Sequence, residues 1–181
     1  MSAPVTINGR VFTIDGNVDT DTIIKSRHCT SAEPEALAAH CLAELSTERP
    51  FRAGAYPLVV CRGTFGIGSA RIQAPLALAG AGVKAVIARA FAPIFFENCV
   101  NGAILLPFSA DLDVWPATGT HLDLRASDGK LLLCRDNAQT VYPCPLPGWV
   151  LSGKSWMDII EAQAIAAGGL ESLRERGLVL D

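Results

Sequence analysis

A glycine-rich segment followed by a serine and an arginine is the first feature of this sequence that could support chemistry. Glycine occupies positions 63, 66 and 68, and Ser69 and Arg71 come directly afterwards. We expect a loop here, because glycine frees the backbone, and a helix that begins beside Ser69. Free N–H groups and the positive end of the helix dipole would then attract an anion. Arg71 could hold a carboxylate through two hydrogen bonds, so the pattern favours a carboxylate or phosphate ligand.

Two phosphate-binding motifs are excluded by their spacing. A P-loop needs a lysine after its second glycine, but Ser69 and Ala70 follow Gly68. The dinucleotide fingerprint GxGxxG needs a third glycine at the position of Arg71. A tight strand-to-helix turn that binds no ligand remains an alternative for this segment.

Asp19 and Asp21 form a second candidate group, because two nearby carboxylates can share acid–base work. The surrounding residues imitate the start of an EF-hand loop, but Thr20 replaces its required glycine and Ser26 its final glutamate, which argues against calcium. A solvated turn, in which the aspartates bond to nearby backbone, is the competing interpretation. On these residues alone we favour the turn.

The elements that would position these residues alternate along the middle of the chain as strand, loop, helix, strand, helix and strand. This order predicts an α/β fold in which helices cross over between parallel strands. Continuous apolar runs indicate strands that are buried on both faces. The predicted strands are 7–14, 58–61, 83–88 and 103–106, and the predicted helices are 33–45, 71–81 and 91–98.

The last third of the chain has a different pattern. Two alternating segments, 122–126 and 130–135, flank Ser127-Asp128-Gly129 and predict a β-hairpin. Ser155 then opens a predicted helix with Trp156 on its apolar side, and the glycines at 168 and 169 end it. A short final helix is predicted to end at residue 177. We expect one domain over residues 1–181, with 150–181 as a C-terminal helical extension.

The cysteines and histidines do not predict a metal site in this chain. The six cysteines form no CxxC pair, and none of the three histidines lies at ligand spacing from a cysteine. Iron–sulfur clusters usually need several clustered cysteines. We therefore expect reduced, mostly structural thiols, three of them in strand-like apolar runs (Cys61, Cys99 and Cys134), and no cluster held by this chain.

Charge and hydropathy narrow the class of protein. The formal net charge is only −3 and no Lys/Arg run is present, which argues against nucleic acid as the main partner. No apolar stretch reaches the roughly 18–20 residues of a membrane span. The N-terminus has no signal-peptide pattern. We therefore expect a cytoplasmic protein with no membrane role.

Several ordered motifs together resemble one family. The run from Asn17 to Ile24, followed by Arg27, resembles the N-terminal signature of isopropylmalate dehydratase small subunits. The run from Gly63 to Arg71 resembles the beginning of their central signature, and Leu106-Pro107 resembles its end. The resemblance is best over 17–107. The chain thus resembles a divergent member of the isopropylmalate dehydratase and aconitase-like hydro-lyase family.

This resemblance implies a fold, an activity and a partner. The fold would be the aconitase swivelling domain, a β/β/α arrangement with a mostly parallel central sheet and an added β-hairpin. The activity would be dehydration and rehydration of a 2-hydroxy di- or tricarboxylic acid, as in leucine biosynthesis. A larger partner subunit would hold a [4Fe-4S] cluster, and this chain would be active only with that subunit. Alone, it could form a homo-oligomer.

The resemblance also implies residue roles. Ser69 would be the base that removes a proton next to a carboxylate, although serine is a weak base unless its alkoxide is stabilised. Arg71 and Arg27 would bind substrate carboxylates. The other implied site residues are Gly68 and Ala70 beside the base, His28 and Thr30 in the loop that contacts the variable substrate side chain, and Asp19, Thr20 and Asp21 as supports.

Some positions depart from the family pattern. Ala70 replaces a second serine, Ile72 and Gln73 replace a Glu-His pair, and Lys25 stands where proline is usual. Ser69 and both arginines remain, so we still favour catalysis. The changes point to a divergent substrate or a loss of activity more than to ordinary isopropylmalate chemistry. Two alternatives therefore stay open: a non-catalytic binding or regulatory module with the same fold, and a stand-alone enzyme or anion-binding protein.

Overall fold

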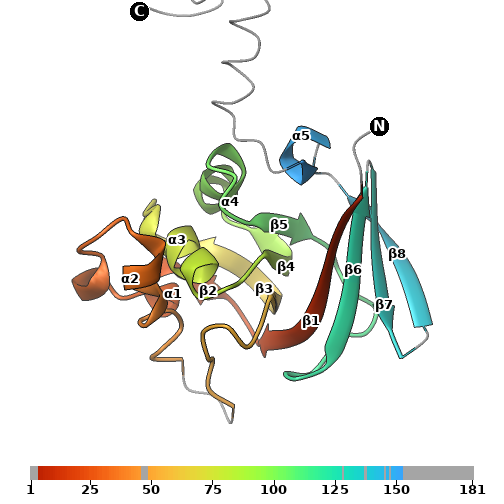
Figure 1. The fold of residues 1–181 in the computed structure, drawn as a ribbon, viewed down its shortest axis with the longest axis horizontal. Helices are drawn as coiled ribbons and strands as arrows, with labels where there is room; N and C mark the ends of the chain where they lie inside the picture. The colour runs from red at the N-terminus through yellow and green to blue at the C-terminus, as the bar shows by residue number, and fades with distance from the viewer. Residues whose placement is uncertain are drawn as a thin grey trace, which may run out of the picture.

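The computed structural model describes residues 4–45, 49–127, 129–136, 138–144, 146 and 148–152. Within them, one curled sheet has the strand order β5-β4-β3-β1-β6-β7-β8, and β2 pairs with β3 outside this path. Helices α1 to α4 lie beside the parallel part, and the antiparallel strands β6 to β8 lie on its other side, with α5 next to them (Figure 1). The strands are β1 (Val5–Ile14), β2 (Val18–Asp19), β3 (Leu58–Ile67), β4 (Ala85–Phe91), β5 (Leu106–Ser109), β6 (His121–Ser127), β7 (Gly129–Arg135) and β8 (Ala138–Cys144). The helices are α1 (Thr20–Ile23), α2 (Pro34–Ala38), α3 (Gln73–Gly80), α4 (Pro93–Asn101) and α5 (Gly148–Leu151), with a 3₁₀ turn at Ser26–His28.

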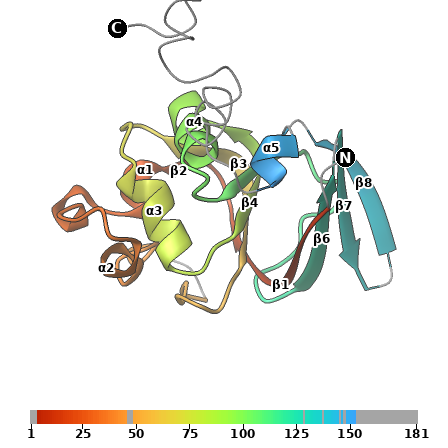
Figure 2. The same ribbon diagram turned by 45° about the horizontal axis from the view of Figure 1, so that its top comes forward.

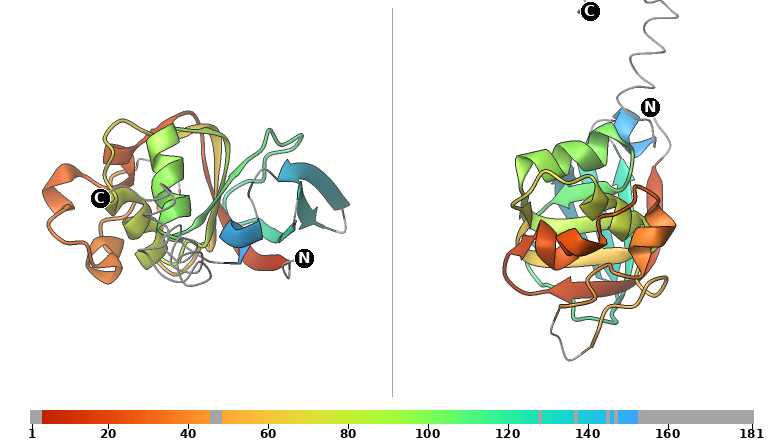
Figure 3. Two further views of the ribbon diagram at one scale, coloured as in Figure 1. Left: turned by 90° about the horizontal axis from the view of Figure 1, so that it is seen from above. Right: turned by 90° about the vertical axis from the view of Figure 1, so that its left-hand side faces the viewer.

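Two apolar cores lie on opposite faces of the parallel strands. In β3, Val59 belongs to the core under the helices, and the next residue, Val60, belongs to the core that includes β6 and β7. Successive residues of β4 divide in the same way, because side chains alternate between the two faces of a sheet. This explains the continuous apolar runs in the sequence. Figure 3 shows the resulting order of helices, parallel strands and antiparallel strands.

Strand β1 joins the two halves of the sheet. Its first half pairs antiparallel with β6, from Val5 opposite Ala126 to Arg10 opposite His121. Its second half pairs in parallel with β3, beginning with Val11 opposite Leu58. One strand thus belongs to both the parallel and the antiparallel parts, which holds the second core together.

Several sequence expectations are confirmed. Strands β1, β3, β4 and β5 form a parallel set, and β6 and β7 form the predicted antiparallel pair. Gly82 follows the last turn of α3 with φ +85°, a conformation that favours glycine at a helix end. The added hairpin is larger than predicted, because β8 pairs antiparallel with β7 and makes a third strand.

The predicted helix 33–45 was wrong in its extent. Helix α2 covers only Pro34–Ala38, and turns follow it. Leu42 has φ +52°, outside the helical region, and its N–H donates to the carbonyl oxygen of Ile23. The backbone of Pro34 also contacts Gly80 of α3. Leu37 and Leu42 are nevertheless buried, so the apolar pattern reported burial correctly although the conformation is not a continuous helix.

The glycine segment was also predicted wrongly. Strand β3 continues through it to Ile67, with a register shift between Cys61 and Thr64 in its pairing with β4. Helix α3 begins only at Gln73, so Ser69 lies in the irregular connection before it. The segment therefore stays in the sheet instead of forming a loop that leads directly into a helix.

Smaller differences concern the ends of elements. Pro107 lies inside β5 and does not end it, which an edge strand tolerates because one side of the backbone needs no partner strand. Cys99 lies in α4 and not in a strand. The polar segment 15–21 contains β2 and the start of α1, which the sequence did not predict. The predicted helices after residue 154 lie outside the described residues, and the single-domain assignment stays a prediction.

No helix in the described part of the chain is long and apolar enough to cross a membrane.

Gly66 is required where β3 passes under α4. Its φ is +84°, and a Cβ at this position would collide with the ring of Phe95. Phe65 and Phe95 pack edge to face with ring centroids 5.4 Å apart. This close approach fixes the end of β3, from which the chain continues to Ser69.

We expect Gly66→Ala to destabilise the protein more than Gly54→Ala. Both glycines have a similar positive φ, but nothing lies within 4 Å of an added Cβ at Gly54. Crowding at Gly66 should cost an additional 1–3 kcal/mol or so in the free energy of unfolding. Urea unfolding of both variants measures this difference. Equal destabilisation would show that only backbone strain matters at Gly66.

Candidate functional site

The candidate site lies at the carboxyl ends of the parallel strands, where ligands commonly bind in α/β sheets. Ser69 and Arg71 follow β3, and Asp19 ends β2 where α1 begins. Because β2 pairs in parallel with β3, the two ends lie together. Figure 2 shows α1 and α3 side by side at this end of the sheet. The N–H of Thr64 also donates to the Asn17 side-chain oxygen at 2.9 Å.

A chain of hydrogen bonds links Ser69 to Asp21. The Nη2 group of Arg71 donates to Ser69 Oγ at 3.2 Å, and its Nη1 group donates to Asp21 Oδ1 at 2.9 Å. Asp21 also accepts a hydrogen bond from the hydroxyl of Ser26 at 3.2 Å. The guanidinium is therefore held between a serine hydroxyl and a carboxylate, and it carries more N–H donors than these two contacts use.

The charges of Arg71 and Asp21 stabilise each other. The hydrogen bond from Arg71 lowers the pKa of the Asp21 carboxyl, with a smaller contribution from Ser26. Asp21 in turn raises the pKa of Arg71, and the side chain of Cys29 adds to this effect. About a quarter of the Arg71 side chain is exposed, so it remains accessible to a small anion.

Asp19 and Thr20 support this group through local structure. The carboxylate of Asp19 accepts the N–H of Thr22 and so caps α1, as N-terminal aspartates commonly do. Thr20 is a polar residue that is buried, with 3% of its surface exposed. Its hydroxyl oxygen lies 3.5 Å from the place that a Cβ on Gly68 would take. Gly68 has φ +101°, which suits glycine just before Ser69.

Arg27 belongs to a second polar group. Its Nη2 group forms an ion pair with Glu44, and its Nε group donates to His28 Nε2 at 3.2 Å. Lys25 lies 3.9 Å from the other Glu44 oxygen. Thr30 is exposed in the loop that follows. None of these contacts connects Arg27 with Ser69, so the structure brings Arg71 but not Arg27 to the serine.

His28 stacks on His40, with ring centroids 3.8 Å apart and planes 6° apart. Burial lowers the pKa of His28, and the neighbouring His40 and Arg27 lower it further. A neutral ring agrees with the acceptor role of its Nε2 atom. His28 therefore presents an uncharged ring in the loop next to Arg27.

The sequence missed several residues of the site. Ser26, Glu44 and His40 contact predicted site residues, but none of them was itself predicted as a site residue. The prediction that a helix dipole acts at Ser69 was wrong, because α3 begins four residues later. Ala70 is exposed beside Ser69. Its negative charge alone could have suggested Glu44 as a partner of a basic residue, but many other acidic residues in the sequence meet the same criterion.

Within the described residues, no group of three His, Cys, Asp or Glu side chains is close enough to hold a metal ion. Cys29, Cys41, Cys61, Cys99 and Cys134 are free thiols. Burial raises the pKa of Cys41 to about 12 and also raises that of Cys99, so both are poor ligands and nucleophiles at neutral pH. The residues described here therefore do not fit an iron–sulfur cluster.

A protein-family model matches the middle of the chain. The model described as Aconitase C-terminal domain matches residues 17–111, which include β2 to β5 and both polar groups. The matched region is about half of the chain.

Curated relatives are named 3-isopropylmalate dehydratase small subunit. One from Syntrophus aciditrophicus is 36% identical over 140 residues, covering 76% of this chain and 84% of the relative. One from Methanopyrus kandleri, named 3-isopropylmalate dehydratase small subunit 1, is 32% identical over 170 residues, covering 94% of this chain and 93% of the relative. The alignments thus span most of both proteins.

A solved structure has the same fold. It is a crystal structure of 3-isopropylmalate dehydratase (leuD) from Methanocaldococcus jannaschii, with 29% sequence identity and a TM-score of 0.66. The match covers 96% of each chain. The α/β fold class expected from the sequence, with a mostly parallel central sheet, is confirmed.

The titration of Asp21 should depend on Arg71. Because its pKa is lowered in the folded protein, the ion pair stabilises the fold above the ordinary aspartate pKa and is lost as pH falls through the lowered value. We expect carboxyl NMR titration to give a midpoint for Asp21 below 3.8. Arg71→Gln should return it to the ordinary range, whereas the matched exposed variant Arg89→Gln should leave it unchanged. An unchanged midpoint in Arg71→Gln would disprove the pairing.

Proposed function

The chain belongs to the 3-isopropylmalate dehydratase small-subunit family, and we propose that it acts within a heteromeric hydro-lyase on a 2-hydroxy di- or tricarboxylic acid. The observation that carries this proposal is the position of Arg71, whose guanidinium donates to Ser69 Oγ and is anchored by Asp21. This contact supports Ser69 as a base and Arg71 as a carboxylate-binding cation on one short segment after β3.

Ser69 is the proposed base. Removal of water from a 2-hydroxy acid requires loss of a proton from the carbon next to a carboxylate and loss of the hydroxyl from its neighbour. The Oγ of Ser69 takes the proton if it is present as an alkoxide. A neighbouring guanidinium favours the charged form of an oxygen acid, so the 3.2 Å contact from Arg71 supports this role.

Arg71 and Arg27 are the proposed carboxylate ligands. Arg71 is held in place by Asp21 and keeps N–H donors for a substrate carboxylate beside Ser69. Arg27 is 65% exposed but is paired with Glu44 in this structure. A substrate carboxylate would therefore compete with Glu44 for Arg27. A dicarboxylic substrate would bind Arg71 beside Ser69 through one carboxylate and Arg27 through the other.

The remaining proposed site residues shape the surroundings of these groups. Gly68 and Ala70 flank the base without side chains that would block it. His28 and Thr30 lie in the loop that the family resemblance assigns to the variable part of the substrate. The proposed supports are Asp19, Thr20 and Asp21, through the cap of α1, the packing against Gly68 and the anchor of Arg71.

A large partner subunit is part of the proposal, and we place the [4Fe-4S] cluster there. When bound, such a cluster supplies a Lewis acid for the departing hydroxyl. This chain supplies the base and the carboxylate ligands. Activity of the isolated chain is therefore not expected.

We expect Ser69→Ala to lower kcat by about 10²–10⁴-fold in the complex with the large subunit, because a general base contributes about this much. Dehydration of a panel of 2-hydroxy diacids, including 3-isopropylmalate, measures the effect. Ser127→Ala in β6 is the matched control and should retain activity. Copurification with the large subunit shows that assembly is intact. Full activity of an assembled Ser69→Ala complex would favour the non-catalytic module instead.

Variants of the second polar group should change KM in opposite directions. Arg27→Gln removes a carboxylate ligand and should raise KM about 10–100-fold, the usual range for a hydrogen bond to a charged group. Glu44→Gln removes the competing carboxylate and should lower KM. Arg89→Gln, which breaks the exposed pair with Asp111, is the control. Unchanged KM in both Arg27→Gln and Glu44→Gln would remove Arg27 from the site.

A further inference from the structure

An apolar groove lies at the opposite end of the parallel strands from the candidate site. It has a volume of about 570 Å³ and lies between the beginnings of β1 and β5, the turn before β4, and α5. The candidate site lies at the carboxyl ends of the parallel strands, whereas this groove lies at their amino ends. It is therefore a separate feature that the proposed function does not use.

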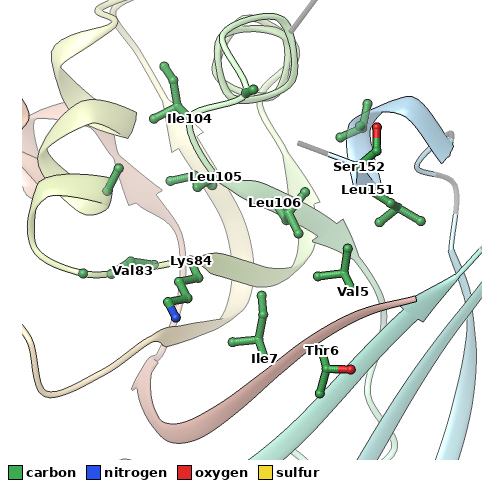
Figure 4. Close-up of a pocket in the computed structure, with 14 residues that line it drawn as sticks. Val5, Thr6, Ile7, Val83, Lys84, Ile104, Leu105, Leu106, Leu151 and Ser152 are labelled. Atoms are coloured by element: carbon green, nitrogen blue, oxygen red, sulfur yellow. The ribbon is translucent and has the colours of Figure 1, made fainter. Parts of the chain in front are cut away.

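The groove is lined mainly by aliphatic side chains. Figure 4 shows Val5 and Ile7 of β1, Leu106 of β5 and Leu151 of α5 around a shared space. Lys84 is the charged residue among those that line it, and its side chain is exposed. Val5, Ile104 and Leu106 are partly exposed in it, and apolar surface of this kind gains free energy when an apolar partner covers it. The lysine favours a partner that also carries a carboxylate.

The chain itself supplies such a segment directly at the groove. Ser152 lines the groove and is the last described residue, and residues 153–181 continue from it. The sequence after Ser155 predicts a helix with Trp156, Ile159 and Ile160 on one side. Asp158 and Glu161 provide carboxylates within the same two turns.

The covalent connection makes this segment the favoured occupant. Four residues span at most about 14 Å when fully extended, so Trp156 stays within that distance of Ser152. A short tether of this kind gives an effective concentration in the millimolar range, which a separate partner rarely reaches. A buried tryptophan also removes about 150–250 Å² of surface from water.

We propose that the C-terminal segment 153–167 packs Trp156, Ile159 and Ile160 into the groove and pairs a carboxylate with Lys84. This contact would cover the amino ends of the parallel strands and leave their carboxyl ends, where the candidate site lies, accessible to the substrate. A second copy of the chain is the competing occupant, because it could insert the same segment into the groove of its neighbour.

Zero-length carbodiimide cross-linking of the full chain tests the contact directly. This reagent joins an amine to a carboxylate only when the two are in contact. We expect mass spectrometry to find Lys84 joined to Asp158 or Glu161 within one chain, while the exposed Lys130 is not joined to either. A mixture of ¹⁴N- and ¹⁵N-labelled protein separates links within a chain from links between chains. Links between chains, or no link from Lys84 to this segment, would overturn the proposal.

Hydrogen exchange of the full chain gives an independent measurement. The amides of residues 156–165 should exchange at least about tenfold more slowly than those of an unstructured peptide. Trp156→Ala combined with Ile160→Ala should abolish this protection and speed exchange at Val5, Ile7 and Leu106, which line the groove. Leu178→Ala is the control. If the double variant changes exchange in the segment but not in the groove strands, the segment does not occupy the groove.

Discussion

Burial of both faces of β3 is the constraint on which the rest of the structure depends. Val59 and Val60 point into different cores, and the exposure of each is 0%. Helices must therefore cover one face, and β6 and β7 must cover the other. Strand β1 makes this possible because it pairs with β3 in one half and with β6 in the other. The layered arrangement is thus a consequence of keeping water away from the central strands.

The same strand brings the candidate site together. Beyond Cys61, β3 leaves its regular register with β4, passes under Phe95 at Gly66 and ends before Ser69. Pairing with β2 brings the start of α1 to this end, where Asp21 meets Arg71. The polar contacts are therefore made by segments about 50 residues apart, held at a fixed distance by the packed sheet below them.

In the isolated chain, the two arginines of the site form ion pairs with carboxylates of the same chain. Asp21 holds Arg71, and Glu44 holds Arg27. Only the first of these pairs includes a contact with Ser69, so the two arginines are not equivalent in this structure. Arg71 is positioned with the base, whereas Arg27 belongs to a loop whose contacts run toward Glu44 and His28. Binding of a diacid between them would require exchange of at least the Glu44 contact.

The sequence alone determined the family, the parallel strands and the motif residues, because these depend on local patterns of apolar residues and on ordered motifs. Tertiary structure alone decided that β3 continues through the glycines, that α2 stops early, and that Glu44 pairs with Arg27. Leu42 shows the reason: its backbone N–H bonds to Ile23, nineteen positions earlier, and this contact outweighs local helix propensity. Which polar groups meet likewise depends on strand pairing between distant segments, and a local pattern does not contain that information.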